Sequence, residues 1–236
     1  MKITNEKIEI GRIIKVYNDY VENPKTVKKW SNDNLGNKTI YQERLINIIQ
    51  LLDYYKLNLK DKKILDVGCA SGNIFPLLNE LGANADNING IDIRPNSIEH
   101  AKKNFPDHNL NVMDARKLIY ADSSFDLIIT FTLFSSILER NYRKKIADEI
   151  IRVLKPGGVI LYYDFRYKNP FNRNVIQIKY SEIKKLFPTM GKKIKPITVF
   201  PPLVRKLGVL NKIFYPILKR ILFLNTHYIG LFRKNN

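Results

Sequence analysis

The sequence predicts an α/β fold, a three-layer, doubly wound (Rossmann-like) and mostly parallel sheet with helices on both faces. Helical patterns separate most of the strand patterns, which cover 63–67, 87–92, 109–113, 125–130 and 157–165. Such alternation favours parallel pairing. After the first strand, Gly68 and Gly72 close two small-residue turns directly before a helical pattern, and Asp92 ends the next strand. This order is typical of the nucleoside-binding half of such a sheet.

Residues 1–56 are predicted to form a helical lid and the first helix of the domain. Breaks are expected at Asn23-Pro24 and over the polar segment 31–37. Residues 41–52 then show apolar positions at helical spacing, which predicts an amphipathic helix.

Residues 57–236 are predicted to form the α/β domain. The remaining helical patterns cover 73–81, 96–104, 141–154 and 180–187. Two more strand patterns, 193–200 and 227–232, bring the predicted sheet to seven strands. Between these two strands we expect a basic amphipathic insertion, residues 201–225.

Positive charge is concentrated in the C-terminal third of the chain. Residues 1–151 hold 22 Lys and Arg against 20 Asp and Glu, whereas residues 152–236 hold 18 against 2, which is +2 against +16. A region that basic is expected to face an anionic partner, such as nucleic acid, a phosphorylated glycan or an anionic membrane. A solvated, solubilising surface is the alternative.

Cysteine and histidine content limits the chemistry. Cys69 is the single cysteine, which excludes an internal disulfide and fits a reducing cytoplasm. The three histidines are scattered and show no metal-ligand spacing, so no metal site is predicted. The polar N-terminus and the absence of eighteen consecutive uncharged apolar residues lead us to expect a cytoplasmic protein without a spanning helix.

The turn after the first strand differs from a dinucleotide-binding turn. A pyrophosphate site requires Gly-x-Gly-x-x-Gly, but the chain has Asp66-x-Gly68-x-Ala70-x-Gly72. An acid two residues before the first glycine repels phosphate and suits an ammonium group. Asp92 is placed to accept hydrogen bonds from the two hydroxyls of a ribose. The ligand indicated is a nucleoside that carries an amino acid.

This stretch resembles motif I of the class I S-adenosylmethionine-dependent methyltransferases, with Ala70 in place of the usual middle glycine. Two later stretches, Phe125–Phe131 and Arg152–Gly158, also resemble motifs of that family and follow at the right spacings. The resemblance covers residues 62–165. It implies S-adenosyl-L-methionine as the cofactor and a seven-stranded sheet whose final strand is antiparallel.

The resemblance also implies a set of cofactor-binding residues. Asp114 and Ala115 correspond to an adenine clamp, for which a cap or turn role of Asp114 is the alternative. Thr130 and Phe131 would line the sulfonium pocket, and Arg44 would pair with the methionine carboxylate or form a surface salt bridge. The full set is Asp66, Gly68, Cys69, Ala70, Gly72, Asp92, Ile93, Asp114, Ala115, Thr130, Phe131 and Arg44.

Acceptor chemistry has to come from residues outside these motifs. A hydroxyl acceptor requires a base that takes its proton as the new bond forms. Asp164 is a candidate base and Arg166 a candidate anchor for phosphate or carboxylate, although the two residues also fit an internal ion pair. His227, which opens the last strand, is the other candidate base, with a structural role as the alternative.

Residues 203–224 combine cations with apolar residues. Arg205, Lys212 and Lys219 are seven residues apart, so they fall on one side of a helix that we expect to kink at Pro216. Such a helix suits peripheral contact with an anionic membrane at its inner face. Packing on the sheet as a substrate cap is the alternative.

The C-terminal third more loosely resembles a subgroup associated with bacterial surface-polysaccharide biosynthesis. We therefore expect O-methylation of a glycan, glycolipid or related small-molecule acceptor that is anionic or lipid-linked. The charge alternatively suggests methylation of RNA or another nucleic acid, although the chain lacks the Asn/Asp-Pro-Pro-Tyr/Phe motif of DNA amino-methyltransferases. A non-catalytic adaptor at a membrane surface is a third hypothesis.

Overall fold

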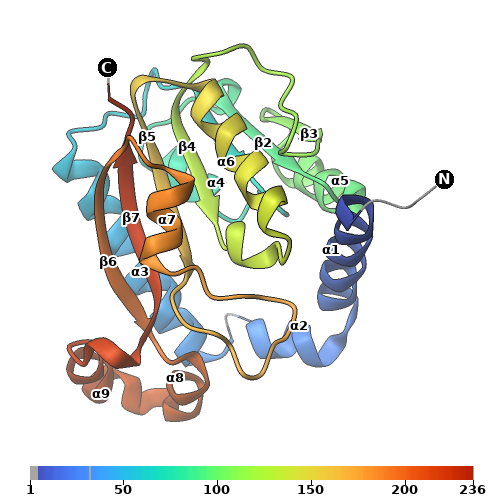
Figure 1. Ribbon diagram of the computed structural model, residues 1–236. Coiled ribbons are helices and arrows are strands. Elements are labelled where there is room, and N and C mark those ends of the chain that lie inside the picture. The colour runs from blue at the N-terminus through green and yellow to red at the C-terminus, as the bar shows by residue number, and fades with distance from the viewer. Residues whose placement is uncertain (1–4, 32, 236) are drawn as a thin grey trace.

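The computed structural model describes residues 5–31 and 33–235, and within them seven strands form one sheet (Figure 1). The strands are β1 Ile64–Val67, β2 Ile88–Asp92, β3 Asn109–Val112, β4 Phe125–Phe131, β5 Leu154–Phe165, β6 Gly191–Val199 and β7 Asn225–Arg233. Their order across the sheet is β3-β2-β1-β4-β5-β7-β6. The first five strands pair in parallel, whereas β7 runs antiparallel between β5 and β6. The predicted doubly wound sheet, with its antiparallel last strand, is confirmed.

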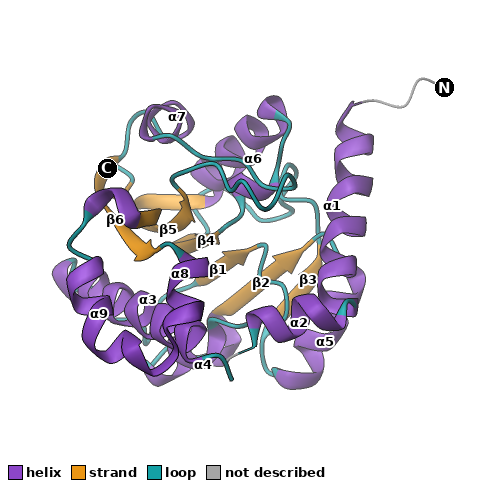
Figure 2. Ribbon diagram, turned by 90° about the horizontal axis from the view of Figure 1, so that it is seen from below, coloured by secondary structure: helices purple, strands orange, loops and turns teal. Residues whose placement is uncertain are grey.

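Helices cover both faces of this sheet (Figure 2). One layer contains α3 Leu35–Tyr54, α4 Phe75–Glu80 and α5 Pro95–Asn104. The other contains α6 Arg140–Val153 and α7 Tyr180–Leu186. The N-terminal helices α1 Asn5–Glu22 and α2 Pro24–Trp30 precede these layers, and α8 Pro201–Leu207 and α9 Asn211–Leu218 lie between β6 and β7.

The central strands are buried on both faces, which explains their continuous apolar runs. In β1, Leu65 and Val67 pack into the cluster under α6 and α7, while Ile64 packs into the cluster under α3 to α5. Asp66 interrupts this run and is itself only 5% exposed. A carboxyl group in such a position has to be explained by function, because burying it unpaired is unfavourable.

Two predicted elements differ from the structure. The helix expected at 41–52 begins at Leu35, because Asn34 caps it by accepting hydrogen bonds from the Gly36 and Asn37 amides. The single kinked helix expected over 203–224 is wrong. Two helices form instead, separated at Gly208, whose positive φ of 52° ends α8, and Pro216 lies inside α9.

Within the described ranges, no helix has both the length and the apolarity needed to cross a membrane.

The insertion between β6 and β7 rests on α3 at a glycine. A Cβ atom at Gly36 would lie 2.4 Å from the carbonyl oxygen of Val204 and 2.6 Å from Cα of Arg205. Because both atoms are backbone, α8 would have to move to accept any side chain there. Glycine at this position therefore lets α3 and α8 pack in direct contact.

We predict that Gly36→Ala lowers the free energy of unfolding by about 1–3 kcal/mol, the usual cost of overpacking. Gly11→Ala is the matched control, since Gly11 also lies in a helix but a Cβ there meets nothing within 4 Å. That control should be neutral or stabilising by up to about 1 kcal/mol through helix propensity. Urea denaturation measures both, and equal effects would contradict the packing argument.

Candidate active site

A cavity opens at the carboxyl ends of β1, β2 and β4, the edge at which open α/β sheets bind ligands. Six of the residues predicted from the sequence line it: Gly68, Ala70, Asp92, Ile93, Ala115 and Phe131. Other parts of its wall come from α1, through Ile13 and Tyr17, and from α6, through Tyr142 and Ile146.

The turn after β1 is fixed by its backbone. The amides of Gly68 and Cys69 both donate to the carbonyl oxygen of Ile91, at 2.8 and 2.9 Å. Gly68 and Ala70 have positive φ values of 78° and 48°, so the chain bends sharply at the cavity. Ala70 thus adopts the left-handed conformation, which glycine would adopt at lower cost.

Asp92 closes the same turn from β2. Its Oδ2 accepts the Ala70 amide at 3.0 Å, and its Oδ1 accepts the Arg94 amide at 2.9 Å. The Arg94 guanidinium also pairs with the carboxylate, with Nε 3.2 Å from Oδ1, and both side chains are less than a tenth exposed. Asp92 is therefore held in one orientation at the cavity wall.

Arg94 connects this acid to the N-terminal helix. Its guanidinium lies over the Tyr17 ring, 5.5 Å from the centroid, and donates to the Tyr17 carbonyl oxygen at 3.4 Å. Tyr17 itself lines the cavity, and its hydroxyl is hydrogen-bonded to Ser136 Oγ. Burial raises the pKa of Tyr17 to about 12, so this phenol stays protonated at neutral pH.

The N-terminal helix α1 is anchored to the loop after β4. Glu9 Oε1 accepts the Leu138 amide at 2.6 Å, and Arg12 Nη2 donates to the Ser136 carbonyl oxygen at 2.6 Å. Glu9 and Arg12 also pair with each other. These contacts hold α1 where Ile13 and Tyr17 cover one side of the cavity.

Asp66 lies directly before the turn and receives no hydrogen bond from the described residues. Burial, and then the nearby Asp92 carboxylate, raise its pKa to about 8. Asp66 is thus a protonated acid at neutral pH unless a cation approaches it.

Asp114, at the end of β3, is instead an ionised acid. Burial works against ionisation, but the Arg116 side chain and amide both donate to it, and the net pKa is lowered. Tyr142 also donates to Asp114 Oδ1, at 3.2 Å. Asp114 does not itself line the cavity but contacts Tyr142, which does.

Known proteins were compared with this chain. The family model described as "Methyltransferase domain" matches residues 65–162. The N-methyltransferase NodS from Bradyrhizobium japonicum, solved in complex with S-adenosyl-L-homocysteine, superposes with a TM-score of 0.68 at 14% identity. That superposition covers 95% of this chain and 100% of NodS, and it establishes the class I methyltransferase fold.

Two curated relatives are each similar to about half of this chain. A sterol 4-C-methyltransferase of Caenorhabditis elegans is 29% identical over 126 residues, which is 50% of this chain and 36% of that protein. A tRNA N(3)-methylcytidine methyltransferase of Schizosaccharomyces pombe is 31% identical over 126 residues, which is 49% of this chain and 40% of that protein. The chain thus spans less than half the length of either relative.

Three further residues predicted from the sequence lie outside the cavity lining. Cys69 is buried among apolar side chains, and burial strongly raises the pKa of its thiol. Gly72, with φ of 79°, leaves room for the Phe75 ring, which a Cβ atom would meet at 2.5 Å. Thr130 is fully buried, and its hydroxyl has no hydrogen-bond partner in the described part of the chain.

Arg44 lies on α3, and its side chain extends to Phe131, the last residue of β4. Its guanidinium lies between the rings of Tyr41, Phe131 and Tyr163, at 5.5, 5.7 and 5.4 Å from their centroids. Its Nε is buried without a hydrogen-bond partner among the described residues. Phe131 lines the cavity, and its ring lies between the cavity and the Arg44 guanidinium.

The candidate acceptor residues lie outside the cavity lining. Asp164 is completely buried, and its carboxylate accepts the amides of Ser135 at 3.1 Å and Phe165 at 2.8 Å. Burial, partly offset by these hydrogen bonds, raises its pKa to about 6. Arg166 donates to the carbonyl oxygen of Leu222 at 2.8 Å and does not contact Asp164.

His227 is likewise internal. Its ring stacks on Tyr163, with centroids 4.8 Å apart, and Nδ1 is hydrogen-bonded to Thr226 Oγ1 at 2.9 Å. Burial, and then the Arg44 charge, lower its pKa to about 3, so the ring is neutral at physiological pH.

Sequence reasoning missed most of the wall opposite the glycine turn. Tyr17, Ser136 and Tyr142 reach the site through the packing of α1, the loop after β4 and α6, whereas Arg94 follows β2 directly. One sequence signal was available, because Asp92-x-Arg94 and the later Asp114-x-Arg116 repeat the same spacing, and both acids pair with their arginines.

The raised pKa of Asp66 predicts a pH-dependent stability of the ligand-free protein. Between about pH 4 and about pH 8 the folded chain keeps a proton that the unfolded chain releases, so the free energy of unfolding should fall as the pH rises. Asp66→Asn should flatten this slope, as measured by urea denaturation across that range. The exposed Asp122→Asn is the control. Parallel profiles for Asp66→Asn and the unaltered protein would contradict the assignment.

Proposed function

We propose that the protein transfers the methyl group of S-adenosyl-L-methionine to an oxygen atom of a glycan, glycolipid or related small-molecule acceptor. The observation that carries the cofactor assignment is the cavity in which the Gly68–Ala70 turn meets the oriented carboxylate of Asp92.

The residues present fit this cofactor. Asp92 would accept hydrogen bonds from the ribose hydroxyls, although the Arg94 guanidinium must share or yield the carboxylate. The unpaired, buried Asp66 suits the ammonium of the methionyl group, since a nearby cation would favour its ionised form. Ile93 and Ala115 offer apolar walls for the adenine, next to Asp114 and its partners.

The cofactor, when bound, supplies a methyl group already activated by its positively charged sulfur. The chain has to align the acceptor and exclude water. Tyr17 and Ile13 of α1 would cover the site from one side, and Phe131 from another. The Tyr17 hydroxyl remains a hydrogen-bond donor at neutral pH, which suits orienting an acceptor oxygen better than removing its proton.

Asp164 is the base we propose for an oxygen acceptor. Its pKa is raised to about 6, so the carboxylate is largely ionised at neutral pH. It is also a stronger base toward an acceptor hydroxyl than an ordinary aspartate. It lies behind Ser135, whose neighbour Ser136 lines the cavity, so the loop has to shift before Asp164 reaches an acceptor. His227 is a weaker candidate because its pKa is lowered to about 3.

An RNA acceptor is the second candidate. The excess of 16 positive charges over residues 152–236 supports it, as does the similarity to a tRNA methyltransferase of Schizosaccharomyces pombe. Phosphate-dominated binding would weaken steeply with salt.

We predict that Asp92→Asn weakens binding of S-adenosylhomocysteine about 10- to 100-fold, because a hydrogen bond to a charged group contributes about 1.5–3 kcal/mol. Isothermal calorimetry measures this directly, with Asp122→Asn as a matched control far more exposed to solvent. Unchanged affinity in Asp92→Asn would refute the cofactor site.

Transfer of radiolabelled methyl groups into fractionated lipid, glycan and RNA pools tests the acceptor. We expect label in the glycan or lipid fraction, with less label for Asp92→Asn because the cofactor binds more weakly. Asp164→Asn should also reduce the label, and this reduction should grow as the pH rises through about 6, because Asp164 of the unaltered protein then becomes ionised and can act as a base. Label confined to RNA would replace the first proposal with the second. Cofactor binding without any transfer would favour the non-catalytic adaptor.

A further inference from the structure

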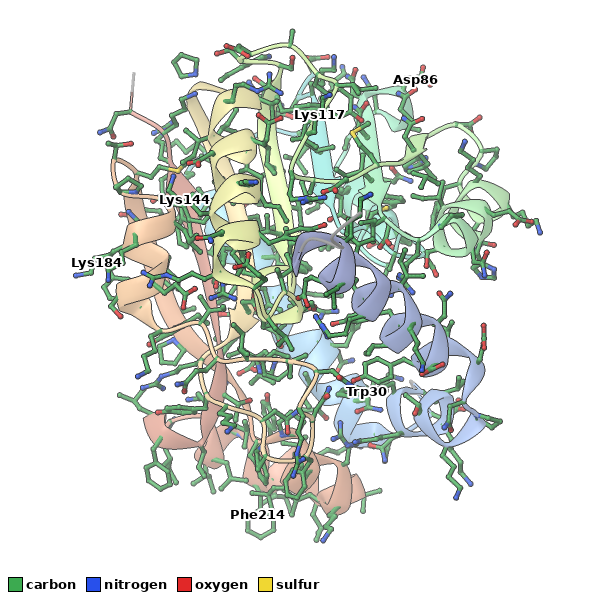
Figure 3. All side chains as sticks on the ribbon, turned by 45° about the vertical axis from the view of Figure 1, so that its right-hand side comes forward. Trp30, Asp86, Lys117, Lys144, Lys184 and Phe214 are labelled. Carbon is green, nitrogen blue, oxygen red and sulfur yellow. The ribbon has the colours of Figure 1, made fainter. Side chains whose placement is uncertain are left out.

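The segment 201–224 has an apolar outer face that nothing in the described chain covers. On α9, Ile213, Phe214 and Ile217 are 64, 43 and 56% exposed. Leu222 and Phe223, just beyond α9, are 63 and 72% exposed. Figure 3 shows Phe214 at the end of the molecule formed by this segment, with its ring pointing away from the protein.

This outer face is distinct from the face that packs on the domain. Val204 and Tyr215 are buried against Val199 and Ile40, and the Tyr215 hydroxyl donates to Glu43 at 2.7 Å. The segment is therefore apolar on two sides, of which one packs against the domain and the other is exposed. Large exposed apolar patches on soluble domains mark interaction sites.

Cations border the outer face. Lys206, Lys212, Lys219 and Arg220 are exposed and form no ion pair in the described ranges, while residues 201–224 contain no acidic residue. Arg205 is different, because it is partly buried over the Trp30 ring, 4.8 Å from the centroid. Trp30 is 53% exposed and extends the surface onto α2 with an amphipathic ring.

We propose that the outer face of residues 201–224 docks onto an anionic membrane surface. Aliphatic and aromatic side chains insert at the boundary of headgroups and acyl chains, while lysine and arginine pair with anionic headgroups. Nucleic acid would use the cations but leave Ile213, Ile217 and Leu222 without a role. A second copy of the chain would bring like charges together across a symmetric interface.

A hydrogen bond connects α9, which carries part of the docking surface, to α3. Glu43 accepts hydrogen bonds from Tyr215 of α9 and, at 2.9 Å, from the Thr198 amide of β6. The next residue is Arg44, which lies over Phe131 at the cavity wall. The helix that carries the docking surface is thus bonded to α3, the helix that carries Arg44 to the Phe131 ring. Docking itself requires no methyl transfer.

Vesicle flotation of the full chain tests this proposal. Vesicles of phosphatidylcholine mixed with phosphatidylglycerol should bind the protein, and vesicles of phosphatidylcholine alone should bind it much less. Lys212→Gln/Lys219→Gln/Arg220→Gln should reduce partitioning roughly 100-fold, about fivefold for each cation removed. Ile213→Ser/Phe214→Ser/Ile217→Ser should reduce it at least as strongly, since these side chains would insert into the bilayer.

Matched controls lie on other parts of the molecule. Lys117→Gln/Lys144→Gln/Lys184→Gln removes the same charge away from the surface, as Figure 3 shows, and Ile46→Ser/Ile119→Ser removes exposed apolar side chains. Neither should change partitioning. Thermal melting confirms that each variant folds, which is expected because every altered side chain is exposed.

Three results would overturn the proposal. The first is equal binding to both kinds of vesicle, and the second is an equal loss of binding in the control variants. The third is that vesicles do not bind the protein, while the α9 substitutions abolish either salt-sensitive RNA binding or concentration-dependent dimerisation. Vesicle binding is measured without cofactor, so it can fail while S-adenosylhomocysteine still binds.

Discussion

The site depends on the carboxylate of Asp92. It accepts the Ala70 amide and so closes the turn after β1, and it pairs with Arg94, which in turn contacts Tyr17 of α1. One buried ion pair thereby connects the glycine turn, the end of β2 and the helix that covers the cavity. Losing either partner would leave the other charge buried and unpaired, which is strongly destabilising.

The acids around this turn differ in charge state because their partners differ. Asp114 pairs with Arg116, which lowers the pKa of this carboxyl, whereas Asp66 has no such partner and burial raises its pKa to about 8. A ligand that carries both a ribose and an ammonium group would donate hydrogen bonds to Asp92 and favour the ionised form of Asp66. The electrostatics of the ligand-free site therefore favour a cationic nucleoside over an anionic one.

The segment between β6 and β7 packs against the domain on one side and exposes apolar side chains on the other. Val204 and Tyr215 fix it to α3 and β6, with Gly36 allowing the close approach of the backbones. Ile213, Phe214 and Ile217 of α9 are exposed beside the exposed cations of the same segment. Packing on the domain and contact with a membrane were alternatives in the sequence, but the structure leaves room for both because they use opposite faces.

The sequence alone determined the sheet, its strands and the turn that lines the cavity. Buried strands, the spacing of Asp66, Gly68 and Gly72, and the acid at the end of β2 are local patterns, and local patterns are what a sequence displays directly. Only the tertiary structure decided the opposite wall of the cavity. Tyr17 and Tyr142 meet there from helices more than a hundred residues apart, through packing that no local period encodes. It also decided the environments of Asp164 and His227, since burial depends on what the rest of the chain places around them.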